Sequence, residues 1–145
     1  MADAIITELK NDHRVIVSLM EGVGASLKEN QFSDHKRIES VLVAHIKKED
    51  QSLYPQLLST AKEKNLLIVL SAIDMAIISM KDISVNVMEF FKRYPTEEDI
   101  IRNLSAFQLD LASIGEVLKK RIDFEERLVY RMYEDYCCLG GNKNE

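Results

Sequence analysis

The sequence has few residues that interrupt a helix. It contains five glycines and two prolines among its 145 residues, and it has no tryptophan. The long stretches between the glycines and prolines carry no turn chemistry, which argues against a fold of many short strands. A hydrophobic content of 46% is sufficient for a packed core, and this length fits one domain. We therefore expect a single all-α domain that spans residues 1–145.

Cysteine is equally scarce. The two cysteines, Cys137 and Cys138, are neighbours in the sequence. A disulfide between adjacent residues is strained, so we expect two reduced thiols near the end of a helix.

Basic clusters and long apolar runs are also missing. The 19 basic and 24 acidic residues give a net charge of -5, and no run of Lys and Arg could follow a phosphate backbone. We therefore expect no nucleic-acid partner. The most apolar stretch, residues 66–80, contains Asp74 and is too short to span a bilayer, and residues 1–20 lack the regions of a signal peptide. These features favour a cytoplasmic protein that does not bind membranes.

Helical periodicity divides the sequence into four long segments. Ser33 is a candidate N-cap for the second segment, and Thr96, followed by three acidic residues, is one for the fourth. We expect helices over residue 3 to the late twenties, residue 34 to or past Pro55, 66–93 and 96–139. Four helices with short connections favour an up-down-up-down antiparallel four-helix bundle.

Ionisable residues interrupt the apolar seam of this predicted bundle. Inward positions recur at alternating steps of three and four residues and should be apolar. Five of these positions carry His13, His45, Glu49, Arg121 and Glu125. The apolar members of the same seam are Ile6, Leu9, Ile16, Met20, Val23, Leu27, Ile38, Leu42, Leu104, Phe107, Leu111, Ile114, Leu118, Leu128 and Met132. An unpaired buried charge is costly, so the five polar residues should pair with one another or bind a metal.

Two segments of the sequence echo each other. Residues 45–54 and 121–130 share isoleucine at their second position, glutamate at their fifth and tyrosine at their tenth. The second segment begins with Arg121 where the first begins with His45. This pattern indicates a pseudo-repeat in which one histidine has been replaced.

These motifs resemble the hemerythrin-like, or HHE, cation-binding family. The resemblance is carried by Asp12-His13, by His45-x-x-x-Glu49 and by the Leu53-Tyr54-Pro55 that follows. Arg121-x-x-x-Glu125-Glu126 stands where the family repeats its His-x-x-x-Glu motif. The resemblance implies a hemerythrin-like four-helix bundle.

The resemblance also implies a set of metal ligands. In the family, one iron is held by histidines of the first and second helices, a second iron by histidines of the third and fourth helices, and two carboxylates bridge them. His13 and His45 match the ligands of the first iron, and Glu49 and Glu125 match the bridges. We therefore expect these four residues to form the metal site.

The second iron site departs from the family pattern. Arg121 occupies its position on the fourth helix, and no histidine follows His45 in the sequence. Its position on the third helix could be Ile73, Met75 or Ile77. Two histidines and two carboxylates suffice for a four-coordinate zinc or for a single iron with open positions. We expect one iron or zinc ion per chain, or none, with the guanidinium of Arg121 replacing the charge of the second metal beside the former bridging carboxylates.

The resemblance favours a sensor or regulatory binding protein, with iron, oxygen or nitric oxide as its input, over a di-iron oxygen carrier. We do not expect an enzyme, because no phosphate-binding loop and no nucleophile with its base is found. One alternative is a histidine phosphotransfer bundle, since Lys48 follows His45 by three residues, although Glu49 stands where that family prefers glycine. Another is a metal-free bundle that binds an unknown protein partner. The remaining histidine, His35, has charged neighbours, and we expect it on the surface.

Overall fold

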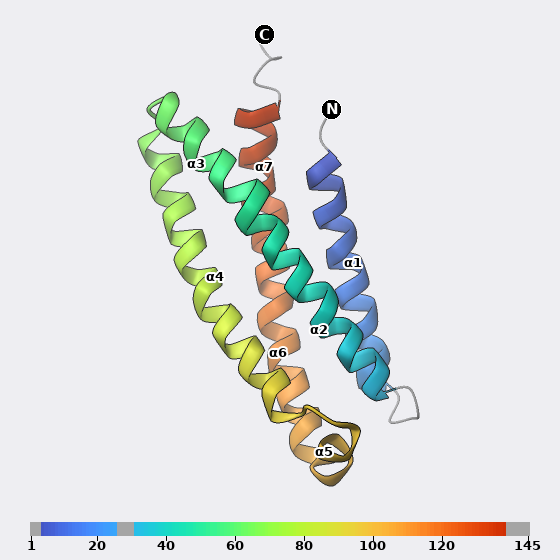
Figure 1. The fold of residues 1–145 in the computed structure, drawn as a ribbon. Helices are drawn as coiled ribbons and strands as arrows, with labels where there is room; N and C mark the ends of the chain where they lie inside the picture. The colour runs from blue at the N-terminus through green and yellow to red at the C-terminus, as the bar shows by residue number, and fades with distance from the viewer. Residues whose placement is uncertain (1–3, 26–30, 139–145) are drawn as a thin grey trace.

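The structure is a computed structural model, and it describes residues 4–25 and 31–138. Within these ranges every element is helical and no strand occurs, so the all-α prediction is confirmed (Figure 1). The elements, with π-helical segments labelled η, are α1 Ala4–Ala25, α2 Gln31–Lys48, η1 Glu49–Leu53, α3 Tyr54–Glu63, α4 Leu67–Arg93, α5 Glu97–Arg102, α6 Leu104–Phe124, η2 Glu125–Val129, α7 Tyr130–Tyr133 and η3 Glu134–Cys138.

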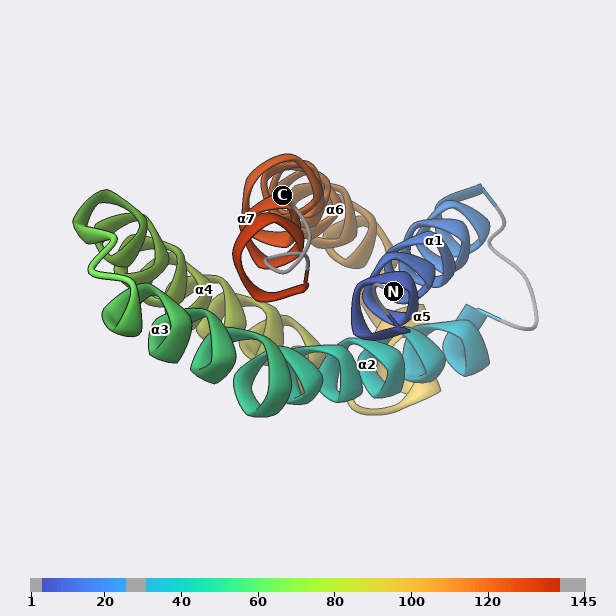
Figure 2. The same cartoon turned by 90° about the horizontal axis from the view of Figure 1, so that it is seen from above.

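The elements join into long helical stretches, called rods below, that lie side by side. α2, η1 and α3 follow one another without a break, and so do α6, η2, α7 and η3. Figure 1 shows the chain reversing its direction between one rod and the next, so that the start of α1 and the end of α7 lie at the same end. Seen along the rods, α4 lies at one edge of the molecule and α1 at the other, with α6 between them (Figure 2).

A short helix, α5, is absent from the predicted set of four. It begins as expected at Thr96, whose Oγ1 accepts from the backbone N–H of Asp99 at 3.1 Å while the Asp99 carboxylate accepts from the backbone N–H of Thr96 at 3.3 Å. The helix then ends at Asn103, whose backbone leaves the helical region at φ -125 and ψ 44. The Asn103 side chain donates to the carbonyl oxygen of Asp99 at 3.1 Å, a local bond that competes with helix continuation. The predicted fourth helix is therefore divided.

Two further boundaries differ from the sequence prediction. α2 begins at Gln31, so Ser33 lies inside the helix and the N-cap assignment was wrong. Leu128 is 39% exposed, whereas its neighbour Val129 is fully buried. The reason is the π-helical segment η2, whose wider turn contains more residues and shifts the inward face by one position. The expected ends of the first and last helices at the late twenties and Leu139, together with Val23 and Leu27 as core residues, lie outside what the structure describes.

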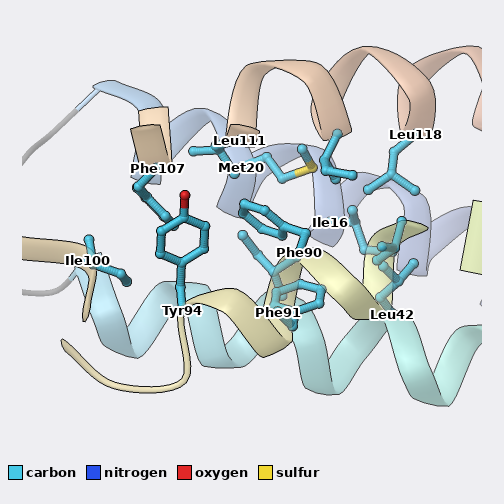
Figure 3. Close-up of a cluster of buried hydrophobic side chains, with 13 residues drawn as sticks. Ile16, Met20, Leu42, Phe90, Phe91, Tyr94, Ile100, Phe107, Leu111 and Leu118 are labelled. Atoms are coloured by element: carbon cyan, nitrogen blue, oxygen red, sulfur yellow. The ribbon is translucent and has the colours of Figure 1, made fainter. Parts of the chain in front are cut away.

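The core consists of two apolar clusters. The first contains Ile16 from α1, Leu42 from α2 and the aromatic rings of α4 and α6 (Figure 3). The second contains Leu9 from α1 together with residues of η1, α3, α4 and α7. Each fully buried aliphatic or aromatic side chain contributes roughly 1.5–3 kcal/mol, so both clusters stabilise the helix packing. Between Leu9 and Ile16, α1 carries His13, and the polar residues therefore form a layer between the clusters.

His35 is buried in the first cluster, which corrects its predicted surface position. It is 1% exposed, and its ring lies 5.5, 5.0 and 5.3 Å from the rings of Phe90, Phe91 and Phe107. His35 precedes Ile38 by three residues and therefore continues the inward rhythm of α2, while the charged Lys36 and Arg37 point to other faces. Its charged neighbours in the sequence led to the incorrect prediction of a surface position for His35.

The remaining features of the chain ends and surfaces are simple. No described helix is both long enough and apolar enough to cross a membrane. Cys137 is a reduced thiol whose Sγ lies 3.5 Å from Oγ1 of Thr60, and burial raises its pKa. The side chain of Cys138 lies outside the described part of the chain.

The buried His35 generates a pH prediction. Burial lowers the pKa of its imidazole below 6.5, and a backbone hydrogen bond involving Tyr94 and the charge of Glu39 offset this only partly. As pH falls below about 6.5, the unfolded chain takes up a proton that the folded chain refuses, so stability is lost. The wild type should therefore lose more free energy of unfolding between about pH 7.5 and about pH 5.5 than His35→Leu, as measured by urea unfolding. Parallel losses in the two proteins would show that His35 titrates normally.

Candidate metal centre

Four buried residues converge in the polar layer between the two apolar clusters. His13 comes from α1, His45 from α2, Glu49 from η1 and Glu125 from η2. Each offers one nitrogen or oxygen atom, and these four atoms all lie within 4.8 Å of one another. Each of the four residues is at most 3% exposed. The structure therefore brings together the four residues that were predicted from the sequence as metal ligands.

The distances define a tight cluster of donor atoms. Nε2 of His13 lies 3.1 Å from Nε2 of His45 and 3.0 Å from Oε1 of Glu125. Nε2 of His45 lies 3.2 Å from Oε2 of Glu49 and 3.6 Å from Oε1 of Glu125. Both imidazoles thus direct the same nitrogen toward the two carboxylates.

The other nitrogen of each imidazole is held by an outer carboxylate. Nδ1–H of His13 donates to Oε2 of Glu126 at 2.7 Å, and Nδ1–H of His45 donates to Oδ2 of Asp12 at 3.0 Å. Lys48 in turn donates to Asp12 at 2.9 Å. Because an ionised carboxylate only accepts, these bonds place a proton on each Nδ1 and direct each Nε2 lone pair inward, as in histidines that ligate metals.

The electron pairs that converge at the centre can be neutralised by a metal ion or by a proton. Besides the two Nε2 atoms and the two carboxylates, Oε1 of Glu49 is buried and has no hydrogen-bond partner among the described residues. Burial alone lowers the pKa of His45, but hydrogen bonds to Glu125 and Glu49 outweigh it and raise the pKa to about 10. Burial and the charge of Glu125 raise the pKa of Glu49. Without a metal, a second proton on His45 supplies the positive charge.

Arg121 supports the centre from its other side. It is 5% exposed, and its Nε–H donates to Oε2 of Glu125 at 3.0 Å. Its Nη2 donates to the hydroxyl of Tyr54 at 2.7 Å and to the carbonyl oxygen of Ala76 at 3.1 Å. The expected pairing of Arg121 with both carboxylates holds for Glu125, while Glu49 accepts instead from Tyr130 at 2.7 Å. One carboxylate thus joins the histidines to the guanidinium.

On α4, the described contacts to Arg121 come from Ala76 and from Ser79, whose Oγ lies 3.5 Å from Nη1. The positions left open by the sequence were Ile73, Met75 and Ile77. Ile73 is buried among apolar side chains, and Met75 is 68% exposed. Among the described residues of α4, the carbonyl oxygen of Ala76 and the hydroxyl of Ser79 therefore face the guanidinium.

The two tyrosines of the sequence echo both reach the centre, which sequence reasoning did not anticipate. Tyr54 directly follows η1, and Tyr130 directly follows η2. The hydroxyl of Tyr130 lies 3.1 Å from Oε1 of Glu125 in addition to its bond to Glu49. Burial raises the pKa of both phenols, so each stays protonated. The shared tyrosine at the tenth position of the echo was the signal for their role.

The same echo appears in the backbone. Glu49 is the first residue of η1, and Glu125 is the first residue of η2. π-Helical turns within α-helices often occur at functional sites, because the wider turn redirects the side chains that follow. The two halves of the pseudo-repeat therefore adopt the same local structure even though His45 and Arg121 differ.

This donor set fits a metal ion. Two imidazole nitrogens and two carboxylates are common ligands of zinc and of single iron ions, and their second hydrogen bonds are already formed. On the Arg121 side, the described residues supply a guanidinium, a carbonyl oxygen and two hydroxyls, and none of these is an imidazole.

The comparisons with known proteins support the first half of this interpretation. Residues 1–57 match the family description "Hemerythrin HHE cation binding domain", which confirms the resemblance over that range. The matched range contains His13, His45 and Glu49, while Arg121 and Glu125 lie beyond it. Curated proteins and solved structures gave no match.

The buried position of Arg121 generates a stability prediction. Removing it leaves the Glu125 carboxylate without its guanidinium partner in the core, and breaking a buried ion pair in this way costs about 3–5 kcal/mol. Arg121→Ala should lower the free energy of unfolding at neutral pH by about that amount in urea titrations of metal-free protein.

Arg127 is the matched control for this experiment. It is 77% exposed and pairs with Asp123 at 3.1 Å on the surface. Arg127→Ala should change the stability by no more than about 0.5 kcal/mol. An Arg121→Ala protein as stable as Arg127→Ala would contradict a structural role for the buried ion pair.

Proposed function

We propose that this chain, which begins with a match to the hemerythrin HHE cation-binding domain, is a hemerythrin-like module that binds one metal ion. Its ligands are His13, His45, Glu49 and Glu125. The long helices form the up-down-up-down bundle of that family, with α5 as an addition. The module acts as a sensor or regulatory protein and not as a di-iron oxygen carrier.

One observation carries this proposal: the four donor atoms lie within 4.8 Å of one another in a layer that excludes water. Converging lone pairs in such a layer repel one another unless a cation lies among them. The bonds from the Nδ1 atoms to Glu126 and Asp12 direct the imidazoles for metal ligation without further rearrangement.

The proposal of one metal ion instead of two follows from Arg121. Its guanidinium lies against Glu125 and brings a permanent positive charge into the space where the second iron of the family would be bound. A second divalent ion beside it would face electrostatic repulsion and would find no imidazole. A single iron held by the four ligands would supply an open coordination position for a small ligand, whereas zinc would form a closed structural site.

The geometry disfavours histidine phosphotransfer. His45 is 3% exposed, and both of its ring nitrogens are engaged, Nδ1 by Asp12 and Nε2 by the centre. Phosphoryl transfer requires a ring nitrogen that a partner protein can reach. A metal-free interaction module, with a proton on His45 in place of the metal, is the other outcome that metal analysis can reveal.

We expect about one zinc or iron ion per chain after purification without chelators or nickel affinity resin, because one set of imidazole ligands is present. Elemental analysis by mass spectrometry measures this ratio. Two irons per chain, with the absorption of an oxo-bridged pair, would contradict the role assigned to Arg121. A chain that takes up neither metal when each is added would contradict metal binding altogether.

Substitution of the histidines tests the ligand assignment. His13→Ala and His45→Ala should each lose the metal, because each removes an imidazole from a site that has two. His35→Leu is the matched control, since His35 is also buried but lies among phenylalanines in the first cluster. It should retain the metal, and the rise in Tm on adding metal should persist in this variant alone. Equal loss in all three variants would show that the metal site lies elsewhere.

A further inference from the structure

α4 carries a second apolar face that nothing in the described structure covers. Its inward face is buried in the two core clusters through residues such as Ile73 and Val87. On the outward side, four large apolar side chains follow one another along the helix, and they are 86%, 68%, 63% and 57% exposed: Ile68, Met75, Ile78 and Val85. Isolated apolar residues on a surface are ordinary, but several large apolar residues aligned on one helix face, here with Ser71 and Asp82 between them, indicate an interaction site.

The spacing of this stripe identifies the kind of surface that fits it. Ile68 and Met75 occupy the first position of successive heptads, and Ile78 and Val85 occupy the fourth. Apolar residues at these two positions form the seam between two packed helices. The partner that the stripe selects is therefore another α-helix.

The stripe is also symmetric about its own centre. Ile68 lies as far before the point between Ala76 and Ile77 as Val85 lies after it, and the same holds for Met75 and Ile78. An antiparallel second copy of the helix, centred on this point, would place Ile68 opposite the partner's Val85 and Met75 opposite the partner's Ile78. A two-fold interface requires this self-complementarity.

The polar residues along the stripe are complementary in the same arrangement, although Asp74 and Lys81 are centred between Ile77 and Ile78, one residue beyond the midpoint of the apolar positions. Asp74 and Lys81 flank the seam on one side, and in the antiparallel arrangement Asp74 would lie beside the partner's Lys81, with the same pair formed a second time across the two-fold axis. Within the seam, Ser71 would lie opposite the partner's Asp82, where its hydroxyl can donate to the carboxylate. Opposite charges thus meet, and one polar pair fixes the register.

We propose that α4 binds α4 of a second copy of this chain in an antiparallel, two-fold interface. α4 lies at the edge of the molecule, with α3 and α6 beside it and its remaining side open (Figure 2). An apolar groove of about 600 Å³ between α4 and α6 adjoins the stripe and shares Met75 with it, so the contact extends beyond a single line of side chains. None of the four candidate metal ligands lines this groove, although Arg121, which pairs with Glu125, does.

A charge exchange tests the interface in the full-length chain. Sedimentation equilibrium should give the mass of two chains for the wild type. Asp74→Lys and Lys81→Asp should each raise the dimer dissociation constant about tenfold, because each places two pairs of like charges across the interface. The double variant Asp74→Lys/Lys81→Asp restores opposite charges and should restore the dimer. All variants should keep the wild-type circular dichroism spectrum, since both residues are exposed.

Arg37→Glu is the matched control, because Arg37 is an exposed cation on α2. It should leave the dissociation constant unchanged. A monomeric wild type would overturn the proposal, and so would single variants that stay as dimeric as the control. Failure of the double variant to recover would overturn the antiparallel register, because this register brings residue 74 beside residue 81 of the partner.

Discussion

The Glu125 carboxylate is the group on which the polar layer depends. Its Oε1 faces the two histidines, and its Oε2 accepts from Arg121, so one side chain is shared between a ligand cluster and an ion pair. Burial disfavours its charge, but the contacts with His13 and His45 and the charge of the Arg121 guanidinium keep its pKa low. An anion so well compensated holds α1, α2 and α6 at fixed distances, and the tyrosines and π-helical segments are arranged around it.

The location of this layer explains how ionisable side chains are tolerated inside the bundle. Apolar clusters lie on both sides of it, and α1, α2 and α6 each pass from one cluster toward the other through a buried polar position, at His13, His45 and Arg121. Water is therefore excluded from both directions, which strengthens every charge interaction within the layer. The same exclusion makes the layer intolerant of an unmatched charge, whether that charge belongs to a side chain or to an ion.

Much of this arrangement could be predicted from the sequence because helical periodicity and metal ligation leave regular traces. The three-four alternation placed His13, His45, Glu49, Arg121 and Glu125 inside, and all are buried. The alternation failed where the backbone departs from 3.6 residues per turn, as at Leu128 after the π-helical turn, and it was not applied to His35 because charged neighbours suggested a surface. Asn103 broke a helix through a side-chain bond that no periodicity reveals. The roles of Tyr54 and Tyr130 depend on tertiary distances, so only their repeated position hinted at them.

The wide separation of the candidate ligands in the sequence affects the order in which the parts of the site can form during synthesis. His13 and Glu125 are 112 residues apart, whereas His13, His45 and Glu49 all lie before residue 50. As a ribosome releases the chain from its beginning, α1 and α2 can pair early and present both imidazoles with a single carboxylate. The last rod then arrives with Glu125 and Arg121 together, delivering the fourth ligand and the positive charge in one docking event. An ion captured by such an early half-site would then be enclosed beside a permanent positive charge.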